Sequence, residues 1–213
     1  MNLQRDRVVL ITCLVFALIQ LYFTSQCFGN GRQQYEFNTG LFCGLFCMVP
    51  WFFYRFGIMK LPLWMVFFID LAIFFHGYGV LMLNYDLLLH YDNLTHSFSS
   101  FVISLCVILT LLTMQRYNSS NRFTPGLLSL FVFLIMAKFG VIWEVFQHLV
   151  NVIAGVGLQS TPWDTIRDLI CNSVGSLAGA LFVLVISHRV PMGELIDSVQ
   201  LHPKLRGFLG SKK

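Results

Sequence analysis

Long runs of apolar residues, separated by short polar segments, dominate the pattern along this chain of 213 residues. A helix needs about 20 mainly apolar residues to cross a lipid bilayer, and six of the runs approach or exceed that length. They are expected at residues 8–27, 38–55, 61–83, 93–115, 125–154 and 163–188. The predicted fold class is therefore all-α, a polytopic bundle of about six transmembrane helices.

Turn-forming residues mark the ends of several predicted helices. Gly29-Asn30-Gly31 interrupts the chain after the first helix, and Gly155-Val156-Gly157 closes the fifth. Pro62 and Pro125 stand at first-turn positions, where the missing N–H of proline costs nothing. These boundaries predict one membrane domain over residues 1–190.

The segment 191–213 is predicted to be a short basic tail. It is expected either to lie in solvent against anionic lipid, the preferred interpretation, or to form a small amphipathic helix over Glu194–Leu201. The N-terminal apolar run lacks a small-residue cleavage site, so it is expected to be retained as the first helix.

Composition supports the membrane interpretation, because 56% of the residues are hydrophobic and only 11% are charged. A soluble domain would have about a quarter charged residues, so lipid must cover much of this surface. The chain contains 6 Cys, mostly inside apolar runs, which does not indicate a disulfide framework. Cys43 and Cys47 share a helical face, which leaves a metal or redox role open beside simple apolar packing.

The basic residues indicate an orientation. Of the 14 Lys and Arg, eleven fall on one predicted side of the membrane: Arg5, Arg7, Arg55, Lys60, Arg116, Arg122, Arg189, Lys204, Arg206, Lys212 and Lys213. The positive-inside rule then places both termini in the cytoplasm and the chain in the cell (inner or plasma) membrane. Because the basic residues sit at helix ends, the expected partners are membrane lipids and not nucleic acid; a homo-oligomer stays open.

Ionisable side chains inside a membrane are costly and usually functional. Here they form three pairs with i, i+4 spacing, all in the outer third of the predicted domain: Asp92 with His96, Glu144 with His148, and Asp164 with Asp168. Each pair shares one face of its helix. Asp168, Asn172, Gly175 and Gly179 extend the last stripe. The predicted arrangement brings the last three helices together around an outward-facing polar pocket.

Imidazole and carboxylate groups in this number could ligate a divalent metal such as zinc, manganese or iron. The candidate ligands are the six residues of the three pairs. Glu144 and Asp168 are also the candidate catalytic carboxylates of a metal-dependent hydrolase, and Ser99, Gln147 and Asn172 are candidate pocket residues.

Structural alternatives stay open. Asp92 could be an N-cap, and Asp164 could belong to a capping box that starts at Thr161. The remaining polar groups could pair with each other or with Arg167 as a clasp without chemistry. Two further intramembrane residues, Asp70 and Lys138, could form a neutralising ion pair. Together with His76 they could instead line an ion path, which predicts a small ion-coupled transporter.

Three motifs in this order resemble the YjdF-like and VanZ-like membrane proteins: Tyr91-Asp92-Asn93-Leu94-Thr95-His96, then Trp143-Glu144 with Gln147, then Asp164-Thr165-x-x-Asp168-x-x-x-Asn172-x-x-Gly175-x-x-x-Gly179. The resemblance covers about residues 85–185. The chain departs from the VanZ pattern in lacking an arginine shortly after the glutamine, and His148 stands where YjdF-like proteins more often have an apolar or aromatic residue.

The resemblance implies an inner-membrane protein. VanZ-like proteins are associated with glycopeptide (teicoplanin) resistance, and YjdF-like proteins have no assigned activity. The leading hypothesis is therefore an envelope protein whose polar pocket binds, and with a metal hydrolyses, a lipid-linked or polar head-group substrate. The alternatives are an ion-coupled transporter and a non-catalytic structural protein.

Overall fold

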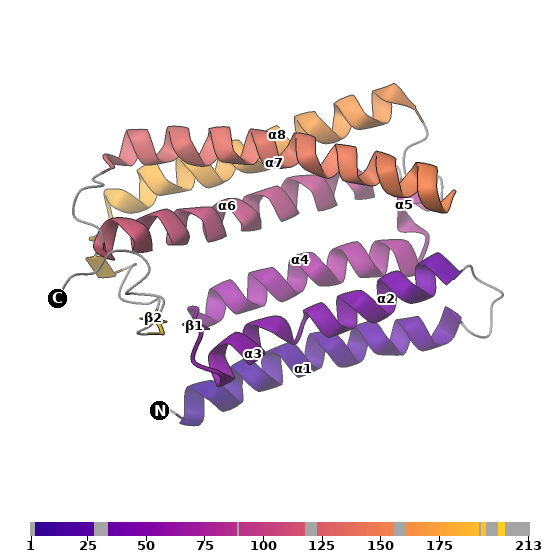
Figure 1. Ribbon diagram of the computed structural model, residues 1–213, viewed down its shortest axis with the longest axis horizontal. Helices are drawn as coiled ribbons and strands as arrows, with labels where there is room; N and C mark the ends of the chain where they lie inside the picture. Colours follow the sequence, from indigo (N-terminus) through magenta and orange to yellow (C-terminus); the bar gives the residue numbers. More distant parts are fainter. Residues whose placement is uncertain are drawn as a thin grey trace. The chain divides into compact units, whose positions relative to one another are not determined.

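The computed structural model describes residues 3–27, 34–88, 90–117, 123–155, 161–191, 193–194 and 200–202. Within these ranges, six helical segments are long and apolar enough to cross a membrane (Figure 1). The prediction of an all-α protein with about six transmembrane helices is thus confirmed. Observed spans differ from the predicted runs by a few residues at their ends, where helices are hardest to delimit from sequence.

The helices divide between two compact units, which are described separately. The first contains α1 (Leu3–Gln26), α2 (Gln34–Phe46), α3 (Val49–Arg55), α4 (Leu63–Leu81) and the single-turn α5 (Asn84–Leu87). The second contains α6 (Tyr91–Tyr117) except its last two residues, α7 (Pro125–Ala154) and α8 (Pro162–Ser187). The prediction of one domain over residues 1–190 depends on how the units meet, and it stays a prediction.

In the first unit, α1 presents one continuous buried face. Val9, Cys13, Ala17, Gln20 and Thr24 are all buried and recur at steps of three or four residues, which is the period of a helical face. This face packs against α2 and α4. The polar members of the face are therefore held inside a three-helix core.

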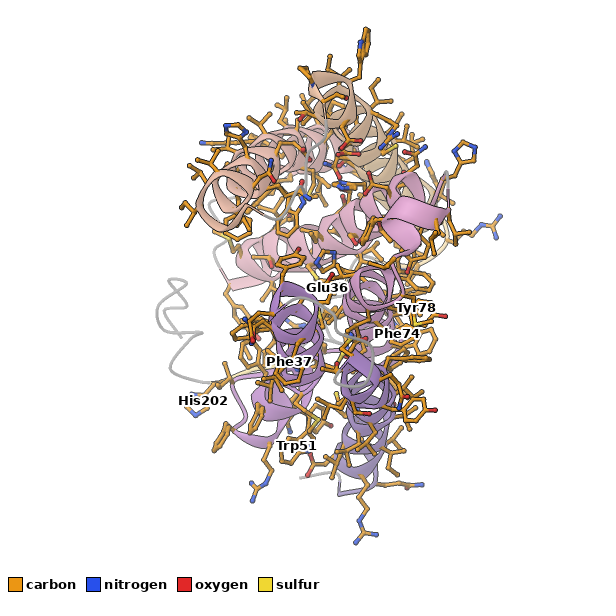
Figure 2. The ribbon with its side chains drawn as sticks, turned by 90° about the vertical axis from the view of Figure 1, so that its right-hand side faces the viewer. Glu36, Phe37, Trp51, Phe74, Tyr78 and His202 are labelled. Atoms are coloured by element: carbon orange, nitrogen blue, oxygen red, sulfur yellow. The ribbon has the colours of Figure 1, made fainter. Side chains whose placement is uncertain are left out.

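Aromatic rings cover another part of this unit. Phe74 and Tyr78, one turn apart on α4, stack with their ring centroids 5.4 Å apart (Figure 2). Phe23 of α1 packs edge-on against Tyr78 at 5.0 Å. Such pairs add stabilisation beyond the area they bury, so they fix α1 against α4.

The second predicted helix, 38–55, is broken in the structure. Helix α2 ends at Phe46 and α3 starts at Val49, with a turn at Cys47 and Met48 between them. Pro50 explains the break, because proline has no N–H to continue the helical hydrogen-bond ladder and its ring clashes with the preceding turn.

Part of the predicted tail is ordered against the first unit. Strand β1 (Met59–Lys60) pairs antiparallel with β2 (Gln200–Leu201), and the His202 N–H donates to the Ile58 carbonyl at 3.1 Å. Gln200 and Leu201 are therefore extended and not helical. The rest of the expected amphipathic helix, residues 195–199, lies outside the described residues, as does most of the tail.

In the second unit, glycines let α6 and α8 approach closely. A Cβ atom at Gly175 would overlap the backbone carbonyl of Ser97, and one at Gly179 would overlap the side chain of Ser104. On the other side of α8, the Ser129 hydroxyl of α7 donates to the Ala180 carbonyl at 2.8 Å. Small residues at helix contacts are typical of membrane bundles, and here they bring the polar stripes within contact distance.

Local sequence signals set the ends of α7 and α8. Thr124 and Thr161 are the N-caps, and each hydroxyl accepts the N–H three residues later, with proline at the first helical position. Helix α7 ends at Gly155 in the left-handed conformation, with φ of 65°. The predicted role of Pro125 as a helix-starting residue is confirmed.

Candidate functional site

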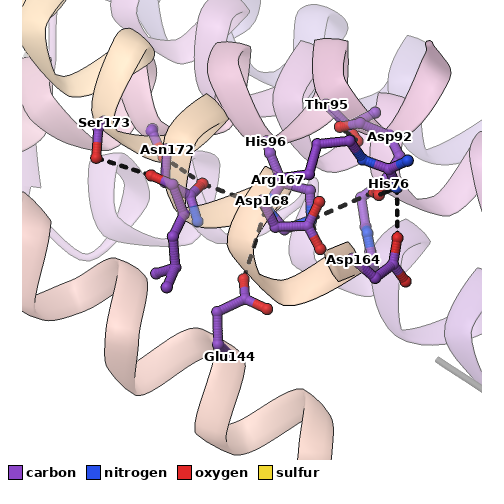
Figure 3. Close-up of polar contacts among 12 residues, drawn as sticks. His76, Asp92, Thr95, His96, Glu144, Asp164, Arg167, Asp168, Asn172 and Ser173 are labelled. Carbon is purple, nitrogen blue, oxygen red and sulfur yellow. Dashed lines mark hydrogen bonds and ion pairs between the residues drawn. The ribbon is translucent and has the colours of Figure 1, made fainter. Parts of the chain in front are cut away.

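The polar side chains of the second unit gather at one end of its three helices. Asp92 and His96 lie near the start of α6, Asp168 lies near the start of α8, and Glu144 lies toward the end of α7 (Figure 3). Because α7 runs antiparallel to its neighbours in such a bundle, its C-terminal part meets their N-terminal parts. Four polar residues from three helices therefore share one site.

His96 is the centre of this cluster. Its Nε2 atom lies 3.3 Å from Asp92 Oδ1 and 3.9 Å from Asp168 Oδ2, and its Nδ1 atom lies 4.0 Å from Glu144 Oε1. The imidazole is 8% exposed, and the carboxylates of Glu144 and Asp168 are buried as well. Three carboxylates thus surround one ring away from solvent.

Asn172 and Ser100 hold this imidazole in place. Asn172 Oδ1 lies 3.2 Å from His96 Nδ1 and accepts a second hydrogen bond of 2.8 Å from the Ser100 hydroxyl. Because an amide oxygen only accepts, the proton of a neutral His96 ring belongs on Nδ1. The lone pair of Nε2 then points toward Asp92 and Asp168.

Arg167 closes the cluster toward its more exposed edge. Its Nη2 atom donates to Asp92 Oδ2 at 3.2 Å and also forms an ion pair with Asp164. The guanidinium is half exposed, whereas the two carboxylates are largely covered. Asp92 therefore presents one oxygen to the imidazole and accepts a hydrogen bond from the guanidinium with the other.

The ligand atoms of Asp92, His96 and Asp168 lie within 4.8 Å of one another, which is close enough to surround a metal ion. One nitrogen and two carboxylate oxygens suit zinc, manganese or iron. Since a cation would sit between the Nε2 lone pair and two carboxylates, it would relieve their mutual repulsion. These are the residues here that could hold a metal.

The structure does not bring every predicted site residue to the cluster. His148 is exposed on α7, one turn beyond Glu144. Gln147 is half-buried, and Ser99 lies one residue away from the stripe that carries His96 and Ser100. Asp164 reaches the cluster through Arg167, while the capping of α8 falls to Thr161. The Thr161 half of the possible capping box is present, since the Thr161 hydroxyl accepts the Asp164 N–H, and the Asp164 side chain also pairs with Arg167.

Two residues of the cluster were not among the candidate site residues. Ser100 follows His96 by four residues, so the spacing that linked Asp92 to His96 could have identified it one turn further along. Arg167 stood as a clasp partner only, because sequence alone does not show which carboxylate a flexible guanidinium reaches. It contacts Asp92, 75 residues away in sequence.

A groove of about 390 Å³ lies between α7 and α8, but its lining is apolar except for Ser173. Ile166, Ile170 and Leu177 of α8 contribute to it. These positions lie on the opposite side of α8 from Asp168 and Asn172, given the 3.6-residue helical period. The groove is therefore separate from the polar cluster.

Residues 7–189 match a family described as "Predicted membrane protein (DUF2238)". The match covers the six spans, apart from the first three residues of the first one, and the whole polar cluster. The chain belongs to this family. No curated protein and no solved structure matches this chain. Membership in this family agrees with the multi-pass membrane protein predicted from the hydrophobic pattern.

Members of a membrane family must satisfy buried polar groups internally, since lipid offers no hydrogen bonds. Asn172 does this for His96 and Ser100, so replacing it with alanine should leave both groups without that partner. We expect Asn172→Ala to lower the free energy of unfolding by about 1–3 kcal/mol, measured by denaturation in detergent.

Ser173→Ala is the matched control for this change. Ser173 is exposed next to Asn172, and its hydroxyl donates within its own helix to the Leu169 carbonyl at 2.7 Å. Its loss should change stability by less than about 0.5 kcal/mol. Equal effects of the two substitutions would show that the Asn172 side chain does not hold α6 to α8.

Proposed function

We propose that the second unit binds a divalent metal ion through Asp92, His96 and Asp168, and that the bound metal hydrolyses a lipid-linked or polar head-group substrate. The convergence of one imidazole nitrogen and two carboxylate oxygens within 4.8 Å is the observation that carries this proposal. Such a set leaves coordination positions open for water or substrate, as in catalytic metal sites.

The charge of the cluster supports a cation. Four carboxylates, those of Asp92, Glu144, Asp164 and Asp168, stand around one guanidinium and one imidazole. Even a protonated imidazole would leave the ionised cluster negative. Uncompensated charge is costly in a low-dielectric interior, and a divalent ion would balance it.

The chemistry of this set is hydrolysis. A metal held by Asp92, His96 and Asp168 would supply a hydroxide-like nucleophile and would polarise the phosphoryl or acyl oxygen of the substrate. The oxygen of water forms a bond to the phosphorus or carbon, and the bond to the leaving oxygen breaks. Glu144, 4.0 Å from His96 but outside the group of three ligands, takes the proton from water and passes it to the leaving oxygen.

The proposed setting is the cell membrane, with both termini in the cytoplasm and the cluster toward the outer face. The distribution of Lys and Arg supports this orientation. The resemblance of the motifs around Asp92, Glu144 and Asp168 to YjdF-like and VanZ-like proteins supports the choice of residues and names no reaction. Head groups on the outer leaflet are substrates within reach of such a site.

A structural ion cluster is the second candidate, and the bridge from Arg167 to Asp92 and Asp164 favours it. In this case a protonated His96 would take the place of the metal and lock three helices together. The transport alternative needs Asp70 and Lys138 to act together. These residues belong to different units, so their pairing stays a prediction.

Metal binding separates the first two candidates. We expect the purified protein to bind about one Mn²⁺ per chain, seen as loss of the free-ion paramagnetic resonance signal, and to gain thermal stability from it. Mn²⁺ is chosen because it prefers oxygen and nitrogen ligands over thiols. A protein without bound Mn²⁺, whose unfolding temperature is the same with chelator, would support the ion cluster instead.

Glu144→Gln tests the hydrolytic step. The amide keeps the size of the side chain but cannot take a proton, so hydrolysis of phosphodiester and carboxylic ester head-group analogues should fall by about 10²–10⁴-fold. Mn²⁺ binding should persist. Hydrolysis at the wild-type rate with this variant would remove Glu144 as the base.

A further inference from the structure

The first unit has a buried carboxylate near the middle of a membrane span, which the proposed function does not use. Asp70 of α4 has no exposed surface, and among the described residues no group makes a well-formed hydrogen bond to either carboxylate oxygen. An ionised carboxylate is very costly in such surroundings, and ionisable residues inside a membrane are usually functional. Asp70 therefore needs a proton or another cation to neutralise it.

A second buried polar side chain lies in the same helix interface. Gln20 of α1 is fully buried, and neither polar atom of its amide has a hydrogen-bond partner among the described residues. A Cβ atom at Gly77 would overlap this amide, so the amide lies against the α4 backbone. Gly77 follows Asp70 by seven residues, which places the two on one face of α4, about 10 Å apart along its axis. Gln20 is therefore two helical turns from Asp70.

The line of buried polar groups continues to the start of α2. Thr24, one turn beyond Gln20 on α1, is buried, and a Cβ atom at Gly40 of α2 would overlap its hydroxyl. Glu36 lies one turn before Gly40, and its Oε2 atom is buried with no hydrogen-bond partner in the part of the chain that the structure describes (Figure 2). Glu36 as a whole is only half-buried. Polar groups thus lead from a partly exposed helix end toward Asp70.

Within the described part of the first unit, no buried side chain is a lysine or an arginine. The titratable groups on the buried faces of α1 to α3 are thiols and a phenol, which never carry positive charge: Cys13, Cys43, Cys47 and Tyr54. The charged residues of these helices lie at their ends: Arg5, Asp6, Arg7, Glu36 and Arg55. Toward the end of α4, His76 Nδ1 lies 3.0 Å from the Tyr85 hydroxyl of α5. Compensation of the Asp70 charge therefore falls to a bound cation.

We propose that Asp70 reversibly binds a proton, and that Gln20, Thr24 and Glu36 line its route from the solvent at the start of α2. On uptake, a proton leaves a water or hydronium oxygen and forms an O–H bond with a carboxylate oxygen; release reverses this step. The proton is favoured over a metal ion because Asp70 and Gln20 lie farther apart than two ligands of one ion. Water carries the proton between groups too distant for a direct hydrogen bond.

This function uses residues of the first unit alone, so it is independent of the proposed metal site. Loss of the metal site in His96→Ala should leave proton binding by Asp70 unchanged. Conversely, Asp70→Asn should leave Mn²⁺ binding by the second unit unchanged.

Labelling of wild-type, full-length protein with dicyclohexylcarbodiimide tests the proton on Asp70 and needs no variant to fold. This apolar reagent reacts with a protonated carboxyl: the carboxyl oxygen bonds to the central carbon of the reagent, and the proton moves to a nitrogen. We expect mass spectrometry to find the reagent on Asp70, with less labelling as the pH is raised. The exposed Glu194 is the control carboxylate and should stay unlabelled. Labelling of Asp70 that is absent, or independent of pH, would overturn the proposal.

Hydrogen–deuterium exchange at Asp70 tests the route. The C=O stretch of the protonated carboxyl, assigned by its loss in Asp70→Asn, shifts when D₂O replaces H₂O, and infrared spectroscopy follows the rate. Gln20→Leu, Thr24→Val and Glu36→Leu each remove one polar group from the route. Each should slow the exchange by at least about 10-fold, because the proton then passes a site without a polar partner.

Thr110→Val is the matched control for Thr24→Val. Both threonine hydroxyls donate to the carbonyl four residues earlier in their own helix at 2.8 Å, but Thr110 is exposed on α6. Exchange in Thr110→Val should keep the wild-type rate. A wild-type rate in Gln20→Leu, Thr24→Val and Glu36→Leu alike would show that protons reach Asp70 by another way and would overturn the proposed route.

Discussion

His96→Ala is expected to abolish Mn²⁺ binding by the second unit, with a loss of affinity of more than about 100-fold. Losing an outer-shell partner already costs about 10–100-fold, and His96 is itself the nitrogen ligand between Asp92 and Asp168. The alanine also leaves the two carboxylates facing each other without a ring between them. Titration followed by paramagnetic resonance measures the effect.

His148→Ala is the control that the structure makes possible. His148 has the same side chain and the same i, i+4 relation to a carboxylate, but it is exposed on α7. The Mn²⁺ affinity of the His148→Ala protein should equal that of wild type. If His148→Ala abolished binding and His96→Ala did not, the ligand set inferred from the cluster would be wrong.

Gly175→Ala is expected to lower the stability of the second unit more than any other substitution that adds a single methyl group there. The added Cβ would overlap the Ser97 carbonyl, and backbone cannot move aside as the end of a flexible side chain can. Overpacking of this kind costs about 1–3 kcal/mol of stability. Because α6 and α8 must separate, the 3.2 Å contact between His96 and Asn172 should lengthen, and Mn²⁺ affinity should fall as well.

Gly126→Ala is its matched control. No described atom lies within 4 Å of a Cβ added at Gly126, near the start of α7. Alanine also has the better helix propensity, so stability should be unchanged or slightly higher, by up to about 1 kcal/mol. Thermal unfolding in detergent compares the two variants. If Gly175→Ala unfolded at the temperature of wild type, close α6–α8 packing would not be what positions the site.

The expected effects of His96→Ala and Gly175→Ala follow from the same physical condition. Polar groups in a membrane need protein partners. The glycines bring α6 and α8 together, and Asn172 then reaches Ser100 and His96. Without that approach the carboxylates would lack the imidazole that joins them. Stability and Mn²⁺ affinity are therefore expected to fall together in Gly175→Ala, whereas Mn²⁺ affinity is expected to stay unchanged in His148→Ala.

Much of this protein could be predicted from its sequence. The six spans follow from the length of the apolar runs, since a bilayer sets a minimum length for any helix that crosses it. The pairing of Asp92 with His96 follows as well, because i, i+4 residues are neighbours on any α-helix. These features depend on local geometry and on the solvent alone.

The choice of which polar residues meet depends on the tertiary structure. Glu144 and His148 share one face of α7 by spacing, yet Glu144 is 4% exposed and His148 is exposed, because the neighbouring helices cover only one of the two turns. The reach of Arg167 to Asp92 likewise joins residues far apart in sequence. Periodicity defines the face a residue lies on, whereas depth and rotation against the adjacent helix decide what it touches.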